Sequence, residues 1–360
     1  MRSFFVMLMA VGGLASIAQW LMYRTIFPCL ASKWSILIFA VPVFAFSLIN
    51  GYMNVLPLVL TRALGWITGL YLGFFYYSVL LCLLFVVGLL LGKIIGVPSL
   101  ASWIAKGGFA FILLLLIVGA WNATHHVYRE ETFTTAKQLE RPVKIAFVAD
   151  LHLGVLFGKS YSENLVAKIN AAQPDIVLLG GDIIDNDLQF VKNEGSLEPL
   201  QNLQAPMGVY GVYGNHDVMR GTGETEGKYL EKLNLKMVCN ETVHIGDNIV
   251  LTGLDDFMRS HNSYEFAQAP GNKLALFMEH QPRSIERAAA KGYDLSFAGH
   301  THAGQFYPNR EITKRMYSLD YGSKFFGQML ATVTNGYSLW GIPLRIGPAP
   351  EIVIINVGNK

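Results

Sequence analysis

The sequence predicts an α/β protein with an N-terminal four-helix transmembrane region. Three observations lead to this prediction. Residues 1–129 contain none of the 26 Asp and Glu residues of the chain, whereas soluble domains are rich in both. The same segment contains four apolar stretches long enough to cross a bilayer. After Pro142, apolar runs of strand length alternate with amphipathic helical patterns, as in α/β domains. We expect a transmembrane region over residues 1–122, a linker over 123–142 and the α/β domain over 143–360.

The four apolar stretches are expected to be membrane-spanning helices. Trp and Tyr residues lie near their ends, where amphipathic rings favour the headgroup layer. The first stretch has a signal peptide as its alternative interpretation. A retained helix is favoured, because no short small-residue cleavage site stands out and three further apolar stretches follow. The stretches run over about residues 4–23, 34–58, 64–91 and 104–121.

The charges around these stretches bear on topology and on function. Lys and Arg residues are divided almost evenly between the two sides, so the positive-inside rule does not decide which side the rest of the chain faces. The stretches contain no acidic residue, although intramembrane ionisable groups mark most ion and proton pathways. A membrane anchor is therefore favoured over a channel or a transporter.

The predicted linker is polar and mixed in charge. It contains His125 and His126, which we expect to be solvated rather than a ligand pair. From Glu130 onward acidic residues outnumber basic ones, which argues against a nucleic-acid partner. The chain has 3 Cys residues, two of them in the apolar third, so the α/β domain has no disulfide framework and a reducing compartment is permitted.

Two helices and five strands are expected in the α/β domain. One helix is predicted over residues 160–172, where Leu165, Val166 and Ile169 recur at helical spacing. Another is predicted over residues 282–291, with Pro in its first turn and Gly directly after its end. The apolar runs of strand length read VKIAFVAD, DIVLLGGD, GVYGVYGNHD, LALFMEH and LSFAGHTH.

Each of these five runs ends in residues of the types that bind metal ions in proteins. Ligands of open α/β sheets bind beyond the carboxyl ends of strands, so the five loops are expected to converge on one pocket. A single Asp, Asn or His at such a place is often only a turn former or helix cap, but five clusters in the same position favour one site. The clusters are Asp150-Leu-His152, Gly181-Asp182, Gly214-Asn215-His216-Asp217, Glu279-His280 and Gly299-His300-Thr-His302.

The chemistry of these clusters favours a transition-metal pair. A mixed set of oxygen and nitrogen ligands suits Mn, Fe, Zn or Ni better than Ca or Mg. The ligands are too many for one ion, whereas two ions that share a carboxylate would use them all. Paired ions about 3.5–4 Å apart serve in-line phosphoryl displacement, in which a metal-bound hydroxide attacks phosphorus. A nearby His can then protonate the leaving group.

In this order, the motifs Asp-x-His, Gly-Asp, Gly-Asn-His-Asp, His and Gly-His-x-His resemble those of the calcineurin-like metallophosphoesterases, over roughly residues 143–356. The resemblance implies a four-layer α/β/β/α fold and two divalent metal ions, with Mn expected first. It implies that Asp182 bridges the ions, that His216 is the general acid and that Asp217 orients His216. For Asp217 a helix cap after the turn is the alternative. The implied ligands are Asp150, His152, Asp182 and His302 for one ion, and Asp182, Asn215, His280 and His300 for the other.

The sequence GHTHAGQ and the segment from Gly341 to Glu351 are similar to a bacterial, membrane-anchored branch of YkuE-like and LpxG-like phosphoesterases. This similarity implies a membrane-anchored bacterial protein, and the four apolar stretches add the expectation of a multi-pass protein of the inner membrane. It also implies a lipid-linked phosphodiester or pyrophosphate substrate, such as UDP-diacylglucosamine. Two alternatives stay open: a broad-specificity phosphodiesterase or nucleotidase acting on soluble substrates, and a non-enzymatic membrane sensor or scaffold. The oligomeric state also stays open.

Two further features lie outside the five motifs. Arg345 is a candidate for substrate binding, because a guanidinium fork matches the oxygens of a phosphate group; a surface salt bridge is the alternative. Asp255 and Asp256 follow an apolar run and are interpreted as a turn rather than as part of the pocket.

Overall fold

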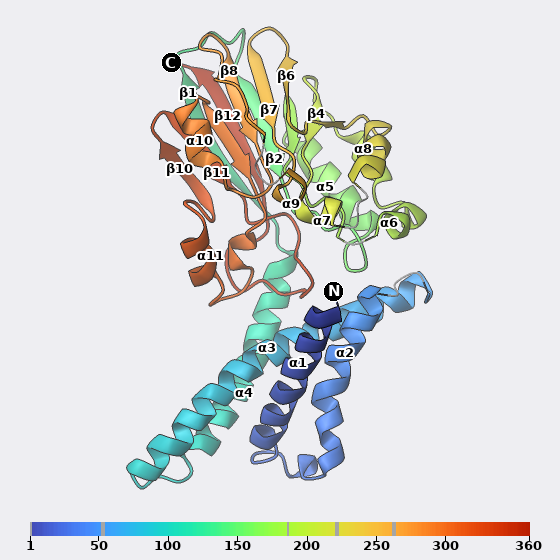
Figure 1. Ribbon diagram of the computed structural model, residues 1–360, viewed down its shortest axis with the longest axis vertical. Coiled ribbons are helices and arrows are strands. Elements are labelled where there is room, and N and C mark those ends of the chain that lie inside the picture. The colour runs from blue at the N-terminus through green and yellow to red at the C-terminus, as the bar shows by residue number, and fades with distance from the viewer. Residues whose placement is uncertain (1, 52–54, 186, 220–222, 261–263) are drawn as a thin grey trace. The chain divides into compact units, whose positions relative to one another are not determined.

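The computed structural model describes residues 2–51, 55–185, 187–219, 223–260 and 264–360; within these ranges the side chains of residues 2–10, 47, 50, 51, 223, 224 and 260 are outside the description. The chain forms two compact units (Figure 1). One unit contains residues Met1–Trp121 and Gly341–Leu344. The other contains residues Asn122–Trp340 and Arg345–Lys360.

The first unit consists mainly of apolar helices. Their packing centres on Tyr23, whose ring stacks on Phe39 and Phe74 and whose hydroxyl forms a 2.8 Å hydrogen bond with Ser78. Two short 3-10 helices, Pro28–Leu30 and Lys33–Ile36, join the first two long helices. The helices are α1 (Arg2–Tyr23), α2 (Leu37–Gly51), α3 (Leu58–Ile94) and α4 (Leu100–Thr124).

The expectation of four membrane-spanning helices is wrong for the described part of the chain. Only α3 and α4 are long and apolar enough there to cross a membrane. The stretch predicted over residues 34–58 instead begins as a 3-10 helix and continues as α2, which has only 15 residues. The helix α1 covers the first predicted stretch, but the side chains of its first residues lie outside the description. An apolar composition gives no signal for where a helix is interrupted.

The second unit contains two six-stranded sheets, so the α/β prediction is confirmed. In the first sheet β2, β3, β4 and β5 are parallel, and β12 lies between β2 and β1, antiparallel to β2 and parallel to β1. Its strands, in spatial order, are β1 (Val127–Thr135), β12 (Glu351–Asn359), β2 (Val143–Val148), β3 (Ile176–Leu179), β4 (Val209–Gly211) and β5 (Lys236–Met237).

The second sheet has a parallel centre and two antiparallel edges. Strands β7, β8, β9 and β11 run parallel, while the edge strands β6 and β10 pair antiparallel with β7 and β11. In spatial order its strands are β10 (Gly322–Phe326), β11 (Met329–Val333), β9 (Leu295–Ala298), β8 (Leu274–Met278), β7 (Ile249–Gly253) and β6 (Glu241–Ile245).

The main core lies between the two sheets. Alternate residues of a strand point to the same face, so Ile145 and Phe147 of β2 both enter this core. The ring of Phe147 lies 5.2 Å from that of Phe297 on β9, which joins the two sheets. A second apolar cluster on the other side of the second sheet includes Phe277 and Ile285. The central strands are therefore buried on both faces, as their continuous apolar runs predict.

Helices surround the sheets, and both predicted helices are present. The helix predicted over residues 160–172 is α5 (Lys159–Ala171), and the one predicted over 282–291 is the shorter α10 (Ile285–Ala290). Figure 1 shows α5 and α10 on different sides of the paired sheets. The other helices are α6 (Leu188–Glu194), α7 (Asn215–Val218), α8 (Gly223–Glu231), α9 (Phe257–Ser260) and α11 (Arg310–Met316), with 3-10 turns at Glu198–Asn202 and His302–Gly304.

The segment predicted as a linker, residues 123–142, contains an element of the sheet. Strand β1 pairs with β12 over nine residues, from Val127 opposite Glu351 to Thr135 opposite Asn359. Phe133 is buried in the core between the sheets. The polar, mixed-charge composition of β1 reflects its edge position, where much of the strand faces solvent.

Candidate active site

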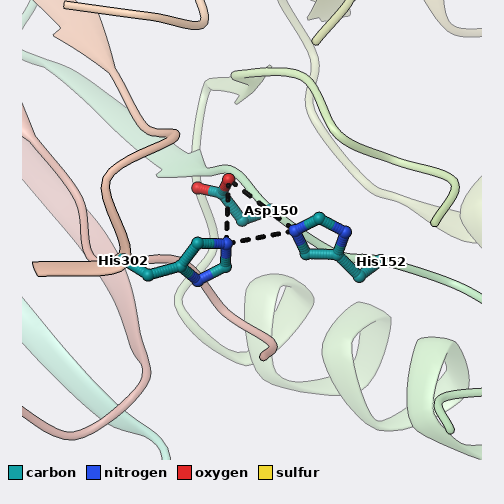
Figure 2. A group of neighbouring side chains, drawn as sticks. All are labelled: Asp150, His152 and His302. Carbon is teal, nitrogen blue, oxygen red and sulfur yellow. Dashed lines mark hydrogen bonds and ion pairs between the residues drawn. The ribbon is translucent and has the colours of Figure 1, made fainter. Parts of the chain in front are cut away.

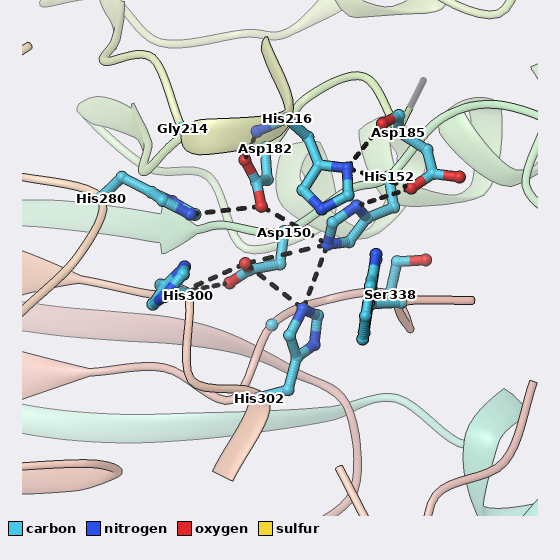
Figure 3. Close-up of polar contacts among 12 residues, drawn as sticks. Asp150, His152, Asp182, Asp185, Gly214, His216, His280, His300, His302 and Ser338 are labelled. Carbon is cyan, nitrogen blue, oxygen red and sulfur yellow. Dashed lines mark hydrogen bonds and ion pairs between the residues drawn. The ribbon is translucent and has the colours of Figure 1, made fainter. Parts of the chain in front are cut away.

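The five predicted clusters directly follow β2, β3, β4, β8 and β9, and the structure brings their side chains together (Figure 3). The backbone turns sharply at these positions. Asp150, Asp182 and His300 have φ values of 58°, 50° and 71°, in the left-handed region that residues with a Cβ atom rarely adopt. His152 and His302 share this conformation. Such strain persists where the surrounding structure enforces it, which is typical of functional sites.

The first group of potential ligands consists of Asp150, His152 and His302 (Figure 2). The two imidazole Nε2 atoms are 3.1 Å apart. The Asp150 Oδ1 atom is 3.5 Å from Nε2 of His302 and 4.0 Å from Nε2 of His152. All three side chains are buried, and their ligand atoms face a common point. This donor set fits a transition-metal ion, which one carboxylate oxygen and two imidazole nitrogens would bind.

The second group consists of Asp182, His280 and His300. The Nε2 atom of His280 is 3.2 Å from Oδ2 of Asp182. The Nδ1 atom of His280 lies 2.8 Å from the carbonyl oxygen of Gly180, to which it donates a hydrogen bond. This hydrogen bond leaves Nε2 as the ring's free ligand atom, the arrangement usual for metal-binding His.

Asp182 links the two groups. Its Oδ1 accepts a 2.8 Å hydrogen bond from the backbone N–H of His216, which fixes the carboxylate. Its Oδ2 lies 3.2 Å from His280 of the second group and 3.7 Å from His152 of the first. Asn215 supplies a further donor, because its buried Oδ1 has no hydrogen-bond partner within the described ranges. One carboxylate thus lies between the two groups of potential ligands.

The charges of the cluster suit cations. Burial opposes ionisation of Asp182, but the positive charge of His280 and its hydrogen bond keep the pKa of Asp182 below its usual value. Burial likewise opposes protonation of His280, and Asp182 outweighs it and raises the pKa of His280 to about 10. Burial lowers the pKa of His300 to about 3, so this ring is neutral and able to donate a lone pair. An ionised, buried carboxylate needs a positive partner, which is the protonated ring of His280 here and would be a metal ion if that ion replaced the Nε2 proton.

Asp185 is a site residue that the sequence analysis missed. Its backbone carbonyl accepts a 2.6 Å hydrogen bond from Nδ1 of His216, and its Oδ1 lies 3.4 Å from Nδ1 of both His216 and His152. The rings of His152 and His216 are perpendicular, with centroids 4.9 Å apart. Asp185 therefore orients a ligand and the proposed acid together. The available signal was a second Asp three residues after Asp182.

Asp217 has contacts that differ from the prediction. Its Oδ2 accepts a 2.8 Å hydrogen bond from the N–H of Gly214, and its Oδ1 accepts a 3.0 Å hydrogen bond from the N–H of Ile184. The side chain is fully buried. The carboxylate thus joins the loop after β3 to the loop after β4, whereas the ring of His216 is held by Asp185. Asp217 therefore connects these two loops and stabilises the backbone of the site.

The interpretation of Arg345 as a phosphate ligand is wrong, and so is the alternative interpretation that it forms a surface salt bridge. The side chain is 0% exposed. Its Nη1 donates a 2.8 Å hydrogen bond to the carbonyl oxygen of His302, and its Nη2 donates to the carbonyls of Asn335 and Ser338 at 3.0 and 2.8 Å. Arg345 therefore secures the backbone that carries His302. Sequence patterns do not distinguish an Arg that binds carbonyls from one that binds a ligand.

His126, predicted to be solvated, packs against the α/β unit. Its ring stacks on that of Tyr337 with centroids 4.0 Å apart, and its Nε2 forms hydrogen bonds with the Tyr161 hydroxyl and the Tyr337 carbonyl at 2.8 and 3.0 Å. Burial, aided by the charge of Lys168, lowers the pKa of His126 to about 4. The ring is therefore neutral near pH 7.

An exposed aromatic ring lies beside the site. Trp340 is 57% exposed, and its ring centroid is 6.1 Å from that of His216. Two hydrogen bonds hold its backbone to the side chain of Gln305, one at 2.9 Å from the Trp340 N–H to Oε1 and one at 3.1 Å from Nε2 to the Trp340 carbonyl. Trp340 therefore presents an exposed aromatic ring beside His216.

Comparison with known proteins agrees with this geometry. The family model described as calcineurin-like phosphoesterase matches residues 143–304. An uncharacterized metallophosphoesterase from Helicobacter pylori (strain ATCC 700392 / 26695) is 30% identical over 271 residues, which are 73% of this chain and 72% of the relative. The chain belongs to the calcineurin-like phosphoesterase family. With its clusters of His and Asp residues, the chain is a metal-dependent phosphoester hydrolase.

Two other relatives in this phosphoesterase family are informative. A transmembrane protein with metallophosphoesterase domain from Danio rerio is 27% identical, over 78% of this chain and 70% of its own length. The uncharacterized metallophosphoesterase YkuE from Bacillus subtilis is also 27% identical, over 59% of this chain and 78% of its own length. The resemblance to YkuE that the sequence motifs indicated is thus present across much of the chain.

Proposed function

We propose that this phosphoesterase is a membrane-anchored, dinuclear-metal hydrolase of a phosphodiester or pyrophosphate bond. Its preferred substrate would be a lipid-linked molecule such as UDP-diacylglucosamine. The observation that carries the proposal is the position of Asp182, whose Oδ2 faces His280 on one side and His152 on the other. A carboxylate that faces both ligand groups can hold two ions close together, and such paired ions serve in-line phosphoryl displacement.

In the proposed centre, two divalent ions, Mn first among the candidates, would activate water and neutralise charge on the phosphate oxygens. Mixed carboxylate, amide and imidazole donors favour Mn, Fe, Zn or Ni over Ca and Mg. The residues proposed to hold the two ions are Asp150, His152, Asp182 and His302 for one, and Asp182, Asn215, His280 and His300 for the other.

We assign His216 the transfer of a proton to the leaving oxygen. Because its Nδ1–H donates to the Asp185 carbonyl, Nε2 is the atom left to hold the transferable proton. A ligand nitrogen of His216 lies within 4.8 Å of the ligand atoms of Asp182 and His152, so the ring borders the centre. A positioned general acid contributes about 10²–10⁴-fold to the rate.

The membrane anchor is proposed from two observations. The helices α3 and α4 are long and apolar enough to cross a bilayer, with 37 and 25 residues. Relatives from Danio rerio and Bos taurus are described as transmembrane proteins with a metallophosphoesterase domain. An anchored hydrolase meets lipid-linked substrates at high local concentration, and we place the chain in the bacterial inner membrane as a multi-pass protein.

The test uses the full chain purified in detergent and loaded with Mn. Turnover of bis-p-nitrophenyl phosphate and of UDP-diacylglucosamine in mixed micelles is compared for wild type, Asp182→Ala and His216→Gln. Matched controls are Asp247→Ala and His244→Gln, two exposed positions of the β6–β7 hairpin. Metal analysis should find about two ions per wild-type chain.

Asp182→Ala should lose bound metal and turnover, and His216→Gln should lose turnover while it keeps metal. Equal turnover in wild type and Asp182→Ala would refute the two-metal proposal. Turnover of the soluble diester without turnover of the lipid would refute the lipid-linked substrate and favour a broad-specificity phosphodiesterase. Metal binding without turnover of either would favour a sensor.

A further inference from the structure

Arg283 is an exposed cation close to the His280 and His300 side of the site. It lies in the loop between β8 and α10, three residues after His280. Its guanidinium carbon is 5.8 Å from the ring of Tyr317, and that ring is 6.1 Å from the ring of His300. Tyr317 therefore lies between the Arg283 guanidinium and the second ligand group.

The Arg283 side chain is held in place by neutral groups. Its Nε donates a 2.9 Å hydrogen bond to Oε1 of Gln281, and Nε2 of Gln281 donates to Oδ2 of Asp256 at 2.9 Å. Gln281 and Asp256 are both buried. The guanidinium also lies over the ring of Phe257, 4.3 Å from its centroid. These contacts, together with a side-chain hydrogen bond to Tyr317, fix the plane of the guanidinium.

Neighbouring Arg residues differ from Arg283 in one respect. Arg259 pairs with the carboxylate of Asp255, and Arg287 pairs with that of Glu265 at 3.0 Å. Across the described ranges, Arg283 forms no ion pair with a carboxylate. An Arg side chain has about 2 kcal/mol of rotamer entropy, which is lost when the side chain is fixed. Because Arg283 is already fixed and has no carboxylate partner, an anion that binds it does not have to offset this loss.

We propose that Arg283 binds the second phosphate of a pyrophosphate substrate while the metal-ligand cluster holds the first. The two terminal nitrogens of a guanidinium match two phosphate oxygens, and such charge-assisted pairs are stronger than neutral hydrogen bonds. The inference rests on the proposed function and names its substrate class as a pyrophosphate rather than a simple diester. Asp256, interpreted from the sequence as part of a turn, becomes the residue that positions Arg283 through Gln281.

The test uses full-length protein in detergent, loaded with Mn, and bis-p-nitrophenyl phosphate as the reporter substrate. UDP-glucose, which has two linked phosphates, and inorganic phosphate, which has one, are compared as competitors. The variants are Arg283→Ala and Arg283→Lys. Arg287→Ala is the matched control, because Arg287 is also surface-accessible and follows Arg283 closely, but pairs with Glu265.

In Arg283→Ala the inhibition constant of UDP-glucose should rise about 10- to 100-fold, the effect of losing a charge-assisted hydrogen bond. That of inorganic phosphate should rise much less, and Arg283→Lys should fall between wild type and Arg283→Ala. The rise in Tm that UDP-glucose produces in wild type should shrink in Arg283→Ala and persist in Arg287→Ala.

Equal inhibition constants for UDP-glucose in wild type and Arg283→Ala would overturn the inference, as would an equal weakening by Arg287→Ala. Parallel losses for UDP-glucose and inorganic phosphate would also overturn it, because they indicate damage to the metal centre. Wild type that fails to turn over bis-p-nitrophenyl phosphate would instead refute the proposed function itself.

Discussion

Replacement of Asp217 by Ala separates two roles for this carboxylate. The sequence motif suggests that Asp217 orients His216, whereas in the structure it accepts the N–H groups of Gly214 and Ile184 at 2.8 and 3.0 Å. The side chain is fully buried, so Ala would leave two backbone donors without an acceptor. Each such donor costs about 1–3 kcal/mol, which gives a loss of about 2–6 kcal/mol in the free energy of unfolding.

The assay is thermal unfolding of the full-length protein in detergent, followed by circular dichroism. For a domain of this size a loss of 1 kcal/mol lowers Tm by about 2–4 °C, so the Tm of Asp217→Ala should fall by at least about 4 °C. Asp217→Asn keeps one acceptor oxygen and should fall by less. The control Asp247→Ala alters an exposed turn and should leave Tm unchanged.

The stabilising role would be refuted by an Asp217→Ala variant with the Tm of wild type. If such a variant also showed the reduced turnover and altered pH profile of His216→Gln, the orienting role would be supported instead. Retained Tm together with full activity would exclude both roles.

Further predictions concern other parts of the molecule. Asp185→Ala should lower metal affinity and turnover by about 10–100-fold, because His152 and His216 lose their shared partner; metal titration and kinetics will show it. His126 has a pKa of about 4 when folded and about 6.5 when unfolded, so its contribution to stability is present above pH 6.5 and is lost as pH falls toward 4. The loss is up to about 3 kcal/mol in the free energy of unfolding. The Tm of His126→Gln should therefore fall less than that of wild type as the pH is lowered from 6.5 to 4. Trp340→Ala should raise KM for substrates with large leaving groups more than for bis-p-nitrophenyl phosphate, which steady-state kinetics can compare. Chelation of the metal should lower Tm, because Mn at 100 times its Kd stabilises by about 2.7 kcal/mol, and added Mn should restore it.

The sequence predicted the α/β unit and its ligand cluster because both depend on local patterns. Buried parallel strands read as continuous apolar runs, and the residues that end them must lie at the sheet edge. The roles of Asp217, Asp185 and Arg345 could not be read in this way. Each depends on which backbone group lies opposite the side chain, and that partner comes from a distant part of the chain.

The helical region shows another limit. Its composition predicted membrane-spanning stretches, but hydropathy does not encode where a helix breaks, so α2 came out shorter than expected. His126 and β1 were assigned to a linker for a related reason. An edge strand with one solvated face is polar, and only its pairing with β12 reveals that it belongs to the sheet.

The place of β12 between β1 and β2 also sets the order in which the catalytic unit can be completed during synthesis. Strands β2 and β3, which carry Asp150 and Asp182 at their ends, are translated long before residues Glu351–Asn359 leave the ribosome. Until then β2 presents an unpaired apolar edge, and β1 has no partner strand. Contacts so distant in sequence form slowly, and unpaired edges promote aggregation. Until β12 is made, the growing chain therefore passes through an aggregation-prone stage in which the edge of β2 is exposed.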